Sequence, residues 1–380
     1  MLPMGWHATI ICKFKGCFSA LSTQQGWGKN KLYFMEVLKK KFRQIPIRMR
    51  IELFFKTPSQ ALATIGMLVR APVDISGFNL PNKVMNDCTL QTARAIKEAF
   101  PSSQSVNRST TDLCVHYSLK NNPEKTIESA AGRLKNFLSD AQRAGASKVL
   151  LVSGGNGGGG KMRKKVNTVT CLQQLQHEGF KMPSGLELGV AFNPYYPTPE
   201  HAQEEFQRLQ EKLDTRLVSH VWINAGSDVR ALEAALVAFN DLRDNHLPYL
   251  KDVRLIGSLF IPSKDLLNKF RFRMWSGLFL SERYMESVEG AMEVTSAIQA
   301  LYARFGVEPL VESAIRTERE LAQLVQVASA APCSPPESLS ASLGQEKSLS
   351  TQEDSLSPKK RTHVESAVVD RARRNRLQSY

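Results

Sequence analysis

The sequence lacks several features that assign a protein quickly to a class. No run approaches the roughly 20 consecutive apolar residues that a transmembrane helix needs. No CxxC pair, no histidine pair with zinc-binding spacing and no Gly-x-Ser-x-Gly nucleophile elbow is present. The six cysteines are widely spaced, which is typical of reduced thiols in a chain of this length. These absences argue against a membrane-spanning protein, a structural zinc protein and a disulfide scaffold.

Acidic residues are missing from the start of the chain, where none precedes Glu36. Residues 1–51 contain ten Lys or Arg residues, and residues 359–380 contain seven against two acids. Since the net charge of the whole chain is +14, the segment between these ends is neutral. The basic, acid-free composition of residues 1–47 predicts a mitochondrial targeting segment. The alternative is an untargeted basic start on a cytoplasmic protein.

The other end of the chain has the composition of a tail. Residues 332–358 contain eight serines and four prolines, and a basic stretch follows them. We therefore expect residues 330–380 to be disordered, because such a segment buries little apolar surface. Basic ends of this kind suit contact with RNA or a ribonucleoprotein through phosphate groups. The sequence leaves the oligomeric state open.

Between these ends, residues 48–329 alternate strand-like and helix-like segments. Strand-like runs occur at 48–55, 73–78, 113–119, 148–152, 186–192, 218–225, 253–261 and 309–315. Helix-like runs occur at 57–69, 88–100, 124–143, 229–242, 281–305 and 318–328, with one more that Thr198 caps and Pro199 begins. Eight strand-like runs in order, seven of them followed by a helix-like run, predict an α/β fold of the (β/α)8 TIM barrel type. An open doubly wound sheet is the alternative, but no dinucleotide fingerprint follows the first strand.

Two polar side chains lie inside strand-like runs. Glu52 is flanked by apolar residues in run 48–55, and a carboxylate buried there without a partner costs several kcal/mol. If alternation turns it into a barrel lumen, its pKa rises and it suits general acid catalysis. An outward salt bridge to a helix is the alternative. His116 lies within run 113–119, where a hydrogen-bonded core histidine is the commoner role than a ligand.

A glycine-rich loop, SGGNGGGGK at 153–161, follows the apolar run 148–152. Part of it fits the phosphate-binding pattern GxxxxGK, but Met162 stands where a magnesium-binding Ser or Thr is needed. We interpret it instead as a flexible loop at the C-terminal rim of the barrel, where active sites of this fold are built. Its basic residues would suit an anionic ligand group.

Several segments taken in order resemble the methylenetetrahydrofolate reductase family. Residues 51–58 (IELFFKTP) resemble its E-F-F-P-P-[KR]-T motif, and residues 189–194 (GVAFNP) resemble its V-A-x-Y-P stretch. Further segments with such a resemblance are 114–118, 148–155, 211–214, 221–228 and 255–262. The common order extends over residues 48–325. The resemblance covers the catalytic barrel of the family and none of its regulatory domain.

The resemblance implies FAD at the C-terminal face, reduced by NAD(P)H, and hydride transfer that converts methylenetetrahydrofolate to methyltetrahydrofolate. Glu52 matches the family's proton donor and Lys212 its flavin-phosphate contact, while Glu205 lies near the acid that holds the ribityl chain. Asn224 replaces the glutamine that contacts the folate. The cofactor-binding positions implied are His116, Ser153, Gly154, Gly155, Asn156, Phe192, Glu205 and Lys212.

The chain also departs from the family. The L-R-G-D loop, whose Arg and Asp flank the flavin and pterin, reads V-S-G-G at residues 152–155. Two functions therefore stay open. One is an FAD-dependent reductase of reduced folate, and the other is a catalytically silent barrel that serves as a structural or RNA- or ribosome-associated subunit in mitochondria.

Overall fold

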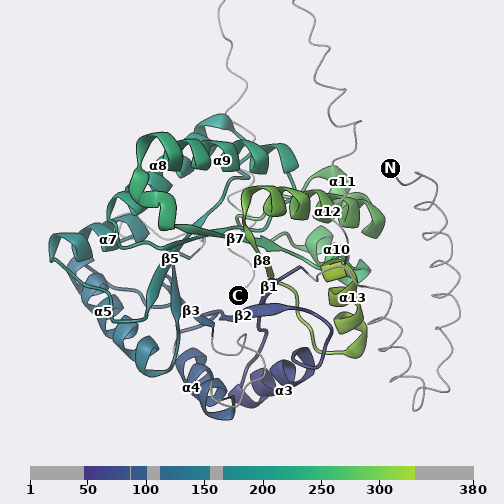
Figure 1. Cartoon of the computed structure of the whole chain (residues 1–380), viewed down its shortest axis with the longest axis horizontal. Coiled ribbons are helices and arrows are strands. Elements are labelled where there is room, and N and C mark those ends of the chain that lie inside the picture. The colour runs from purple at the N-terminus through teal and green to yellow at the C-terminus, as the bar shows by residue number, and fades with distance from the viewer. Residues whose placement is uncertain (1–46, 86, 101–111, 155–165, 330–380) are drawn as a thin grey trace, which may run out of the picture. The chain divides into compact units, whose positions relative to one another are not determined.

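Eight parallel strands close into a barrel around one axis (Figure 1). The computed structural model describes residues 47–85, 87–100, 112–154 and 166–329. The strands are β1 (Met49–Glu52), β2 (Ile75–Leu80), β3 (Leu113–Ser118), β4 (Lys148–Val152), β5 (Glu187–Phe192), β6 (His220–Ile223), β7 (Arg254–Leu259) and β8 (Glu308–Val311). They pair in chain order, and β1 pairs with β8. The predicted (β/α)8 barrel is confirmed, and the open sheet is wrong.

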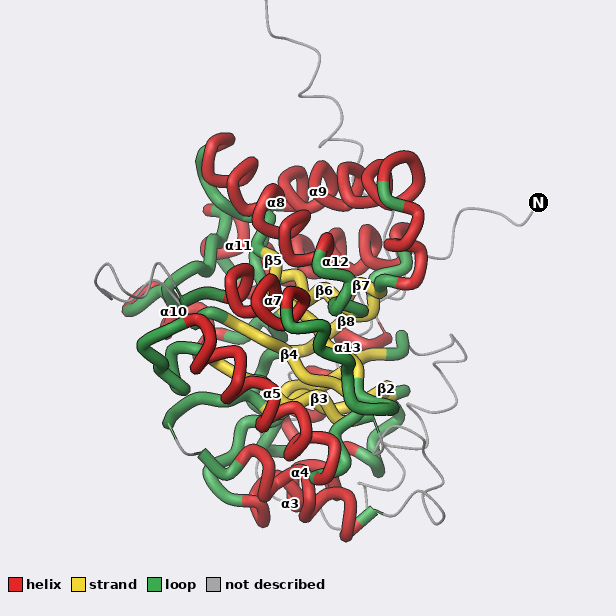
Figure 2. Tube along the Cα trace, turned by 90° about the vertical axis from the view of Figure 1, so that its left-hand side faces the viewer, coloured by secondary structure: helices red, strands yellow, loops and turns green. Residues whose placement is uncertain are grey.

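Helices surround the strands on the outside (Figure 2). The helices are α3 (Pro58–Leu68), α4 (Thr89–Ala99), α5 (Ile127–Arg143), α7 (Thr168–His177), α8 (Pro199–Asp214), α9 (Val229–Asp241), η3 (Leu242–His246), η4 (Pro248–Asp252), α10 (Lys264–Phe272), α11 (Glu282–Glu286), α12 (Val288–Phe305) and α13 (Glu318–Ser329). Thr198 caps α8 as predicted, because its hydroxyl accepts the His201 N–H and Pro199 begins the helix. No helix of these ranges is both long and apolar enough to cross a bilayer.

The helix prediction was incomplete in two places and wrong in one. Helices α7 and α10 were not predicted, because α7 is rich in Thr and Gln and α10 has only two fully buried positions. The helix expected at 281–305 is two helices. Ser287 divides it: the backbone there is extended, with φ −153° and ψ 166°, and its hydroxyl accepts the Gly290 N–H at 2.9 Å to begin α12.

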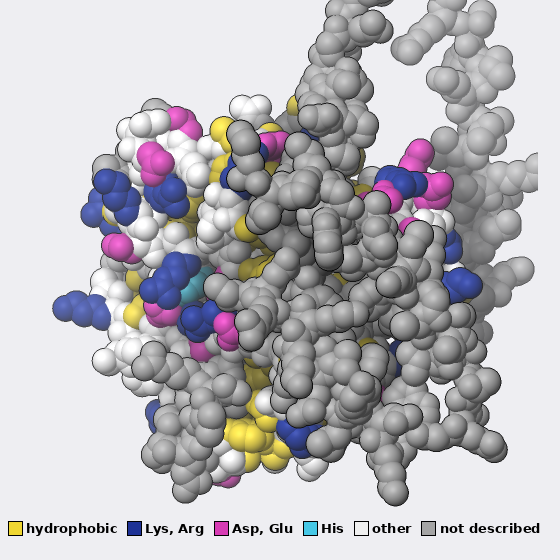
Figure 3. Space-filling view, turned by 45° about the vertical axis from the view of Figure 1, so that its right-hand side comes forward, with side chains coloured by type: hydrophobic (Ala, Val, Ile, Leu, Met, Phe, Trp, Pro, Cys, Tyr) yellow, Lys and Arg dark blue, Asp and Glu magenta, His cyan; other side chains and the backbone are white. Residues whose placement is uncertain are grey.

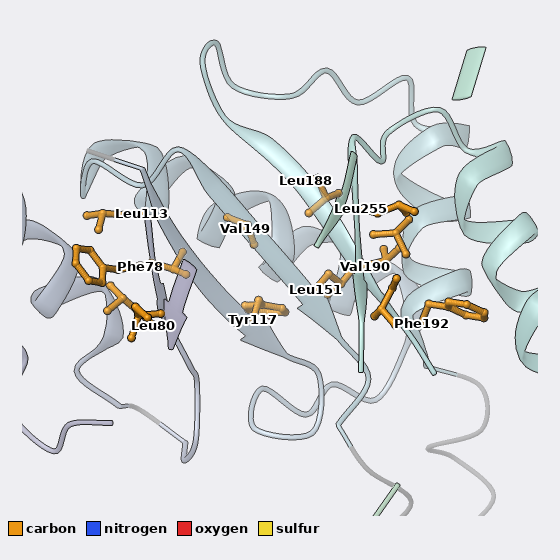
Figure 4. Close-up of a cluster of buried hydrophobic side chains, with 14 of the residues drawn as sticks. Phe78, Leu80, Leu113, Tyr117, Val149, Leu151, Leu188, Val190, Phe192 and Leu255 are labelled. Carbon is orange, nitrogen blue, oxygen red and sulfur yellow. The ribbon is translucent and has the colours of Figure 1, made fainter. Parts of the chain in front are cut away.

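The main core lies between the strands and the helices. Figure 4 shows side chains of this layer at alternate positions, such as Val149 and Leu151 of β4 and Leu188 and Val190 of β5. The residues between them turn to the other side of the sheet, into the lumen. A separate apolar cluster fills part of the lumen and consists of Cys114, Leu150, Trp222, Ile256 and Leu310. Charged side chains of both signs intermingle on the described part of the face in Figure 3, in keeping with the lack of net charge on the described residues.

The N-terminal end of the lumen is closed by a network of buried charges. Arg50 of β1 is fully buried; its Nη1 lies 3.0 Å from Asp112 Oδ2 and its Nε donates to Asn79 Oδ1 at 3.1 Å. Lys148 Nζ lies 2.9 Å from Asp112 Oδ1 and 3.3 Å from Glu187 Oε2. Burial alone would raise the pKa of Asp112, but the two cations outweigh burial and lower it to about 2. Arg50 and Lys148, the buried members of this network, both have acidic partners, which allows these two cations to be buried.

Gly77 of β2 leaves room for the Arg50 guanidinium. A Cβ there would lie 2.5 Å from Asp112 O and 2.7 Å from Arg50 Nη1. We therefore expect Gly77→Ala to lower the free energy of unfolding by about 1–3 kcal/mol. Gly132→Ala on α5 is the matched control: a Cβ there meets nothing within 4 Å, and the change should stabilise by about 0.5–1 kcal/mol. Urea denaturation measures both, and equal effects would contradict the packing described.

Candidate active site

Two carboxyl groups meet at the C-terminal end of the lumen. Glu52 is the last residue of β1, and Glu312 follows β8. The β1–β8 ladder aligns Ile51 with Val311, so the two glutamates occupy the next step on strands that lie about 4.8 Å apart. Ile51 and Val311 both pack in the outer core, which turns Glu52 and Glu312 to the lumen face. Both side chains are half-buried.

This environment favours the protonated form of the pair. Burial and, after it, the neighbouring Glu312 raise the pKa of Glu52 to about 8. Burial also raises the pKa of Glu312, although its carboxylate accepts a short hydrogen bond from the Ser258 hydroxyl. Glu52 therefore carries a proton at neutral pH that it can donate.

One cation faces the pair from the loop after β2. Lys83 lowers the pKa of both glutamates. Burial lowers the pKa of Lys83 itself, and the charge of Glu52 opposes that effect. The Lys83 ammonium lies 3.7 Å from the centroid of the Phe54 ring, a cation–π contact that holds it at this end of the barrel. Neither Lys83 nor Glu312 was predicted from the sequence. Glu312 follows an apolar run and could have been identified as a costly acid in the same way as Glu52, whereas nothing in the sequence places Lys83.

His116 of β3 is a neutral residue of the lumen wall. Arg50 Nε can only donate, so Asn79 Oδ1 accepts from it and Asn79 Nδ2 donates to His116 Nε2 at 3.2 Å. The remaining proton of the ring is then on Nδ1. Burial, followed by the charges of Lys83 and Arg50, lowers the pKa of His116 to about 3. The side chain therefore acts at neutral pH as an uncharged hydrogen-bonding group.

Lys212 and Glu205, expected at a flavin, lie together on the buried face of α8. Lys212 Nζ donates to the carbonyl oxygen of Ala191 in β5 at 2.9 Å and lies 3.8 Å from Glu205 Oε1. Arg208 Nη1 is 3.5 Å from Glu205 Oε2. Burial lowers the pKa of Lys212. The structure thus brings this pair together in the layer between α8 and β5, with the ammonium engaged by the protein itself.

Two further predicted residues point in different directions. Phe192 ends β5 with its ring in the helix layer, 6.1 Å from the ring of Phe206. Asn224 follows β6, on the same strand face as the lumen residue Trp222, and its backbone N–H donates to Phe192 O at 2.8 Å. Asn224 therefore shares the C-terminal end of the lumen with Glu52, whereas the Phe192 side chain does not reach it.

The loop after β4 begins with residues that organise α7. Ser153 Oγ lies 2.7 Å from Thr168 Oγ1 and accepts the Thr168 N–H at 3.2 Å. Gly154 has φ +77°, a left-handed conformation that favours glycine. The predicted ligand residues Gly155 and Asn156 lie outside the described residues.

The lumen cluster of Cys114, Leu150, Trp222, Ile256 and Leu310 gives the site an apolar neighbour. Trp222 is only 2% exposed, and its Nε1 has no hydrogen-bond partner within the part of the chain that the structure describes. A buried donor of this kind is available to a ligand. The described residues contain no group of three or more His, Cys, Asp or Glu side chains arranged for a metal ion.

No protein-family model and no curated protein sequence matches this chain. Solved structures with a similar fold include Yersinia pestis DHPS with a pterine-sulfa conjugate, at 10% identity and a TM-score of 0.38 over 75% of this chain and 92% of that one. Another is assigned as a 2,5-diketo-D-gluconic acid reductase B, at 9% identity and a TM-score of 0.40 over 82% and 93% of the two chains. The chemistry of the site follows from its own residues.

The raised pKa of Glu52 has a consequence for stability. The folded protein holds this proton up to about pH 8, whereas the unfolded chain releases it near its ordinary value of 4.5. The buried carboxyl therefore costs stability that grows as the pH rises through this window. Glu52→Gln removes the cost, so we expect it to raise the free energy of unfolding at pH 8 by on the order of 2 kcal/mol, with little change at pH 4.5.

Urea denaturation across this pH range measures the effect. The matched control is Glu98→Gln, at an exposed position of α4, where a substitution should change the free energy of unfolding by less than about 0.5 kcal/mol. A Glu52→Gln protein with the same pH profile as the unaltered chain would show that the carboxyl is ordinarily solvated.

Proposed function

We propose that this chain is a divergent reductase of the methylenetetrahydrofolate reductase type, in which Glu52 donates a proton to a reduced folate or related pterin bound at the C-terminal end of the lumen. The observation that carries the proposal is the position of Glu52, a proton-bearing carboxyl beside Glu312 at the end of the barrel where this fold places its active sites. Glu52 also stands where the family that the sequence resembles has its proton donor.

The neighbouring residues support this role. Ser258 donates a hydrogen bond to the Glu312 carboxylate and so fixes its orientation. When Glu52 gives its proton to a substrate nitrogen, it becomes a carboxylate beside Glu312, and Lys83 offsets part of the cost of the new charge. Repulsion from Glu312 favours return of a proton from solvent to Glu52 after each turnover. In this proposal Asn224, which follows β6, hydrogen-bonds an edge of the pterin.

In the family that the sequence resembles, FAD would supply the hydride and NAD(P)H would reduce the FAD. The described residues do not fit a flavin phosphate at Lys212, because its ammonium already donates to Ala191 O and lies near Glu205. Binding a phosphate there requires that bond to break. The role proposed for Glu52 therefore rests on no flavin contact.

The second candidate is a catalytically silent barrel, a structural or RNA- or ribosome-associated subunit in mitochondria. The engagement of Lys212 within the protein and the absence of the family's Arg and Asp after β4 favour it. The basicity of the chain ends, which lie outside the described residues, suits such a partner.

Turnover separates the two candidates. We expect the purified full chain, given FAD and methylenetetrahydrofolate, to oxidise NADH or NADPH in a folate-dependent way. Glu52→Gln should lower kcat at least about 100-fold, since a positioned general acid contributes this much, while Glu98→Gln leaves it unchanged. The rate should fall as the pH rises through about 8, because Glu52 then loses the proton it donates.

A visible spectrum taken on the same samples reports bound flavin directly. A colourless protein without folate-dependent turnover, which cosediments with ribosomes and is released by high salt, would overturn the reductase proposal in favour of the silent barrel.

A further inference from the structure

The exposed large hydrophobic side chains of the described residues are gathered at one end of the barrel. Five of the six lie on the loops that follow β2 and β7, and these are Val84, Met85, Phe272, Met274 and Trp275. The sixth, Val237, lies on α9. Both loops leave the C-terminal ends of their strands, so the five side chains belong to the same end of the barrel as Glu52. Single exposed apolar residues are ordinary, but such a concentration marks an interaction site.

Phe272, Met274 and Trp275 lie on the connection between β7 and α12, which is anchored to neighbouring loops. Asn193 Nδ2 donates to Gly277 O at 2.9 Å, and Gly226 forms a β-bridge with Phe279, so the connection is tied to the loops after β5 and β6. Figure 2 shows its helices α10 and α11 toward the left end of the barrel. We call residues 272–275 the apolar ledge.

The two aromatic side chains of the ledge are exposed to solvent, although the Trp275 ring also packs against the protein. The Trp275 ring packs edge-on against Phe270 at 5.2 Å and Phe260 at 5.7 Å, yet its side chain is still 46% exposed. Phe272, at the end of α10, is 92% exposed. A side chain this exposed buries almost no apolar surface in the folded protein, whereas its transfer to an apolar phase is favourable.

Lys and Arg residues lie next to the ledge in the sequence. Residues 264–275 contain four Lys or Arg residues and one acid, whereas the described residues as a whole carry no net charge. Lys269 and Arg273 are exposed, and neither forms an ion pair with the described residues. The partner that complements this segment is therefore negatively charged and also accepts apolar side chains.

We propose that the apolar ledge docks the barrel on the surface of an anionic phospholipid membrane. Phe, Trp and Met with flanking Lys and Arg are the side chains that settle at a bilayer interface, the rings among the acyl chains and the cations at the headgroups. A single-stranded nucleic acid matches the charge and the rings, but it gives Val84, Met85 and Met274 no apolar partner. Docking turns the end with Glu52 and Glu312 toward the membrane.

Vesicle binding tests the proposal. The full chain is mixed with phosphatidylcholine vesicles with and without phosphatidylserine, and the bound fraction is measured by flotation. We expect binding to the anionic vesicles, weakened at least about tenfold in the double variant Phe272→Ser, Met274→Ser, because two exposed apolar side chains are lost. The matched control is Val237→Ser on α9, which should bind like the unaltered chain.

Vesicles with brominated acyl chains distinguish binding through the ledge from binding through the basic chain ends. Bromine quenches the fluorescence only of tryptophans that enter the bilayer. We expect Trp275→Phe, which keeps a ring against Phe260 and Phe270, to remove a measurable part of the quenching. Unchanged quenching in Trp275→Phe, together with unchanged binding in the double variant, would overturn the proposal. So would a double variant that binds vesicles normally and loses affinity for a single-stranded RNA oligonucleotide instead.

Discussion

Pairing of β1 with β8 is the constraint on which the rest of the structure depends. It closes the sheet, so that every second side chain of eight strands faces a packed lumen rather than solvent. An ionisable group on that face has to find an opposite charge or lose its own. Strand β1 shows both outcomes two residues apart. Arg50 meets Asp112 at the N-terminal end, and Glu52 keeps its proton at the C-terminal end.

The two ends of the lumen consequently serve different purposes. Towards the N-terminal end the charges of Arg50, Asp112 and Lys148 compensate one another, an arrangement that specifies how the strands meet. At the C-terminal end, Glu52 and Glu312 share one environment, and among the described residues Lys83 is the cation that acts on both, so two acids there face one cation. Unbalanced carboxyl groups destabilise a fold, and such cost is characteristic of sites arranged for proton transfer.

The sequence was sufficient to locate the strands, although it missed helices α7 and α10. Alternation and strand composition located all eight strands, and a Thr–Pro pair located the start of α8. The apolar flanks of Glu52 identified it as a costly buried acid. The sequence could not predict the contacts that depend on closure of the barrel, because Glu312, the neighbour of Glu52, follows the last strand. Similarly, only the packing of α8 against β5 shows that the Ala191 carbonyl engages Lys212.

Infrared difference spectroscopy tests the central claim most directly, since a protonated carboxyl has a carbonyl stretch that a carboxylate lacks. The band that is present in the unaltered protein and missing in Glu52→Gln belongs to this one side chain. The account predicts that it is present at neutral pH and fades as the pH rises through about 8. A band that appears only in acid, near the ordinary pKa of a solvated glutamate, would contradict it.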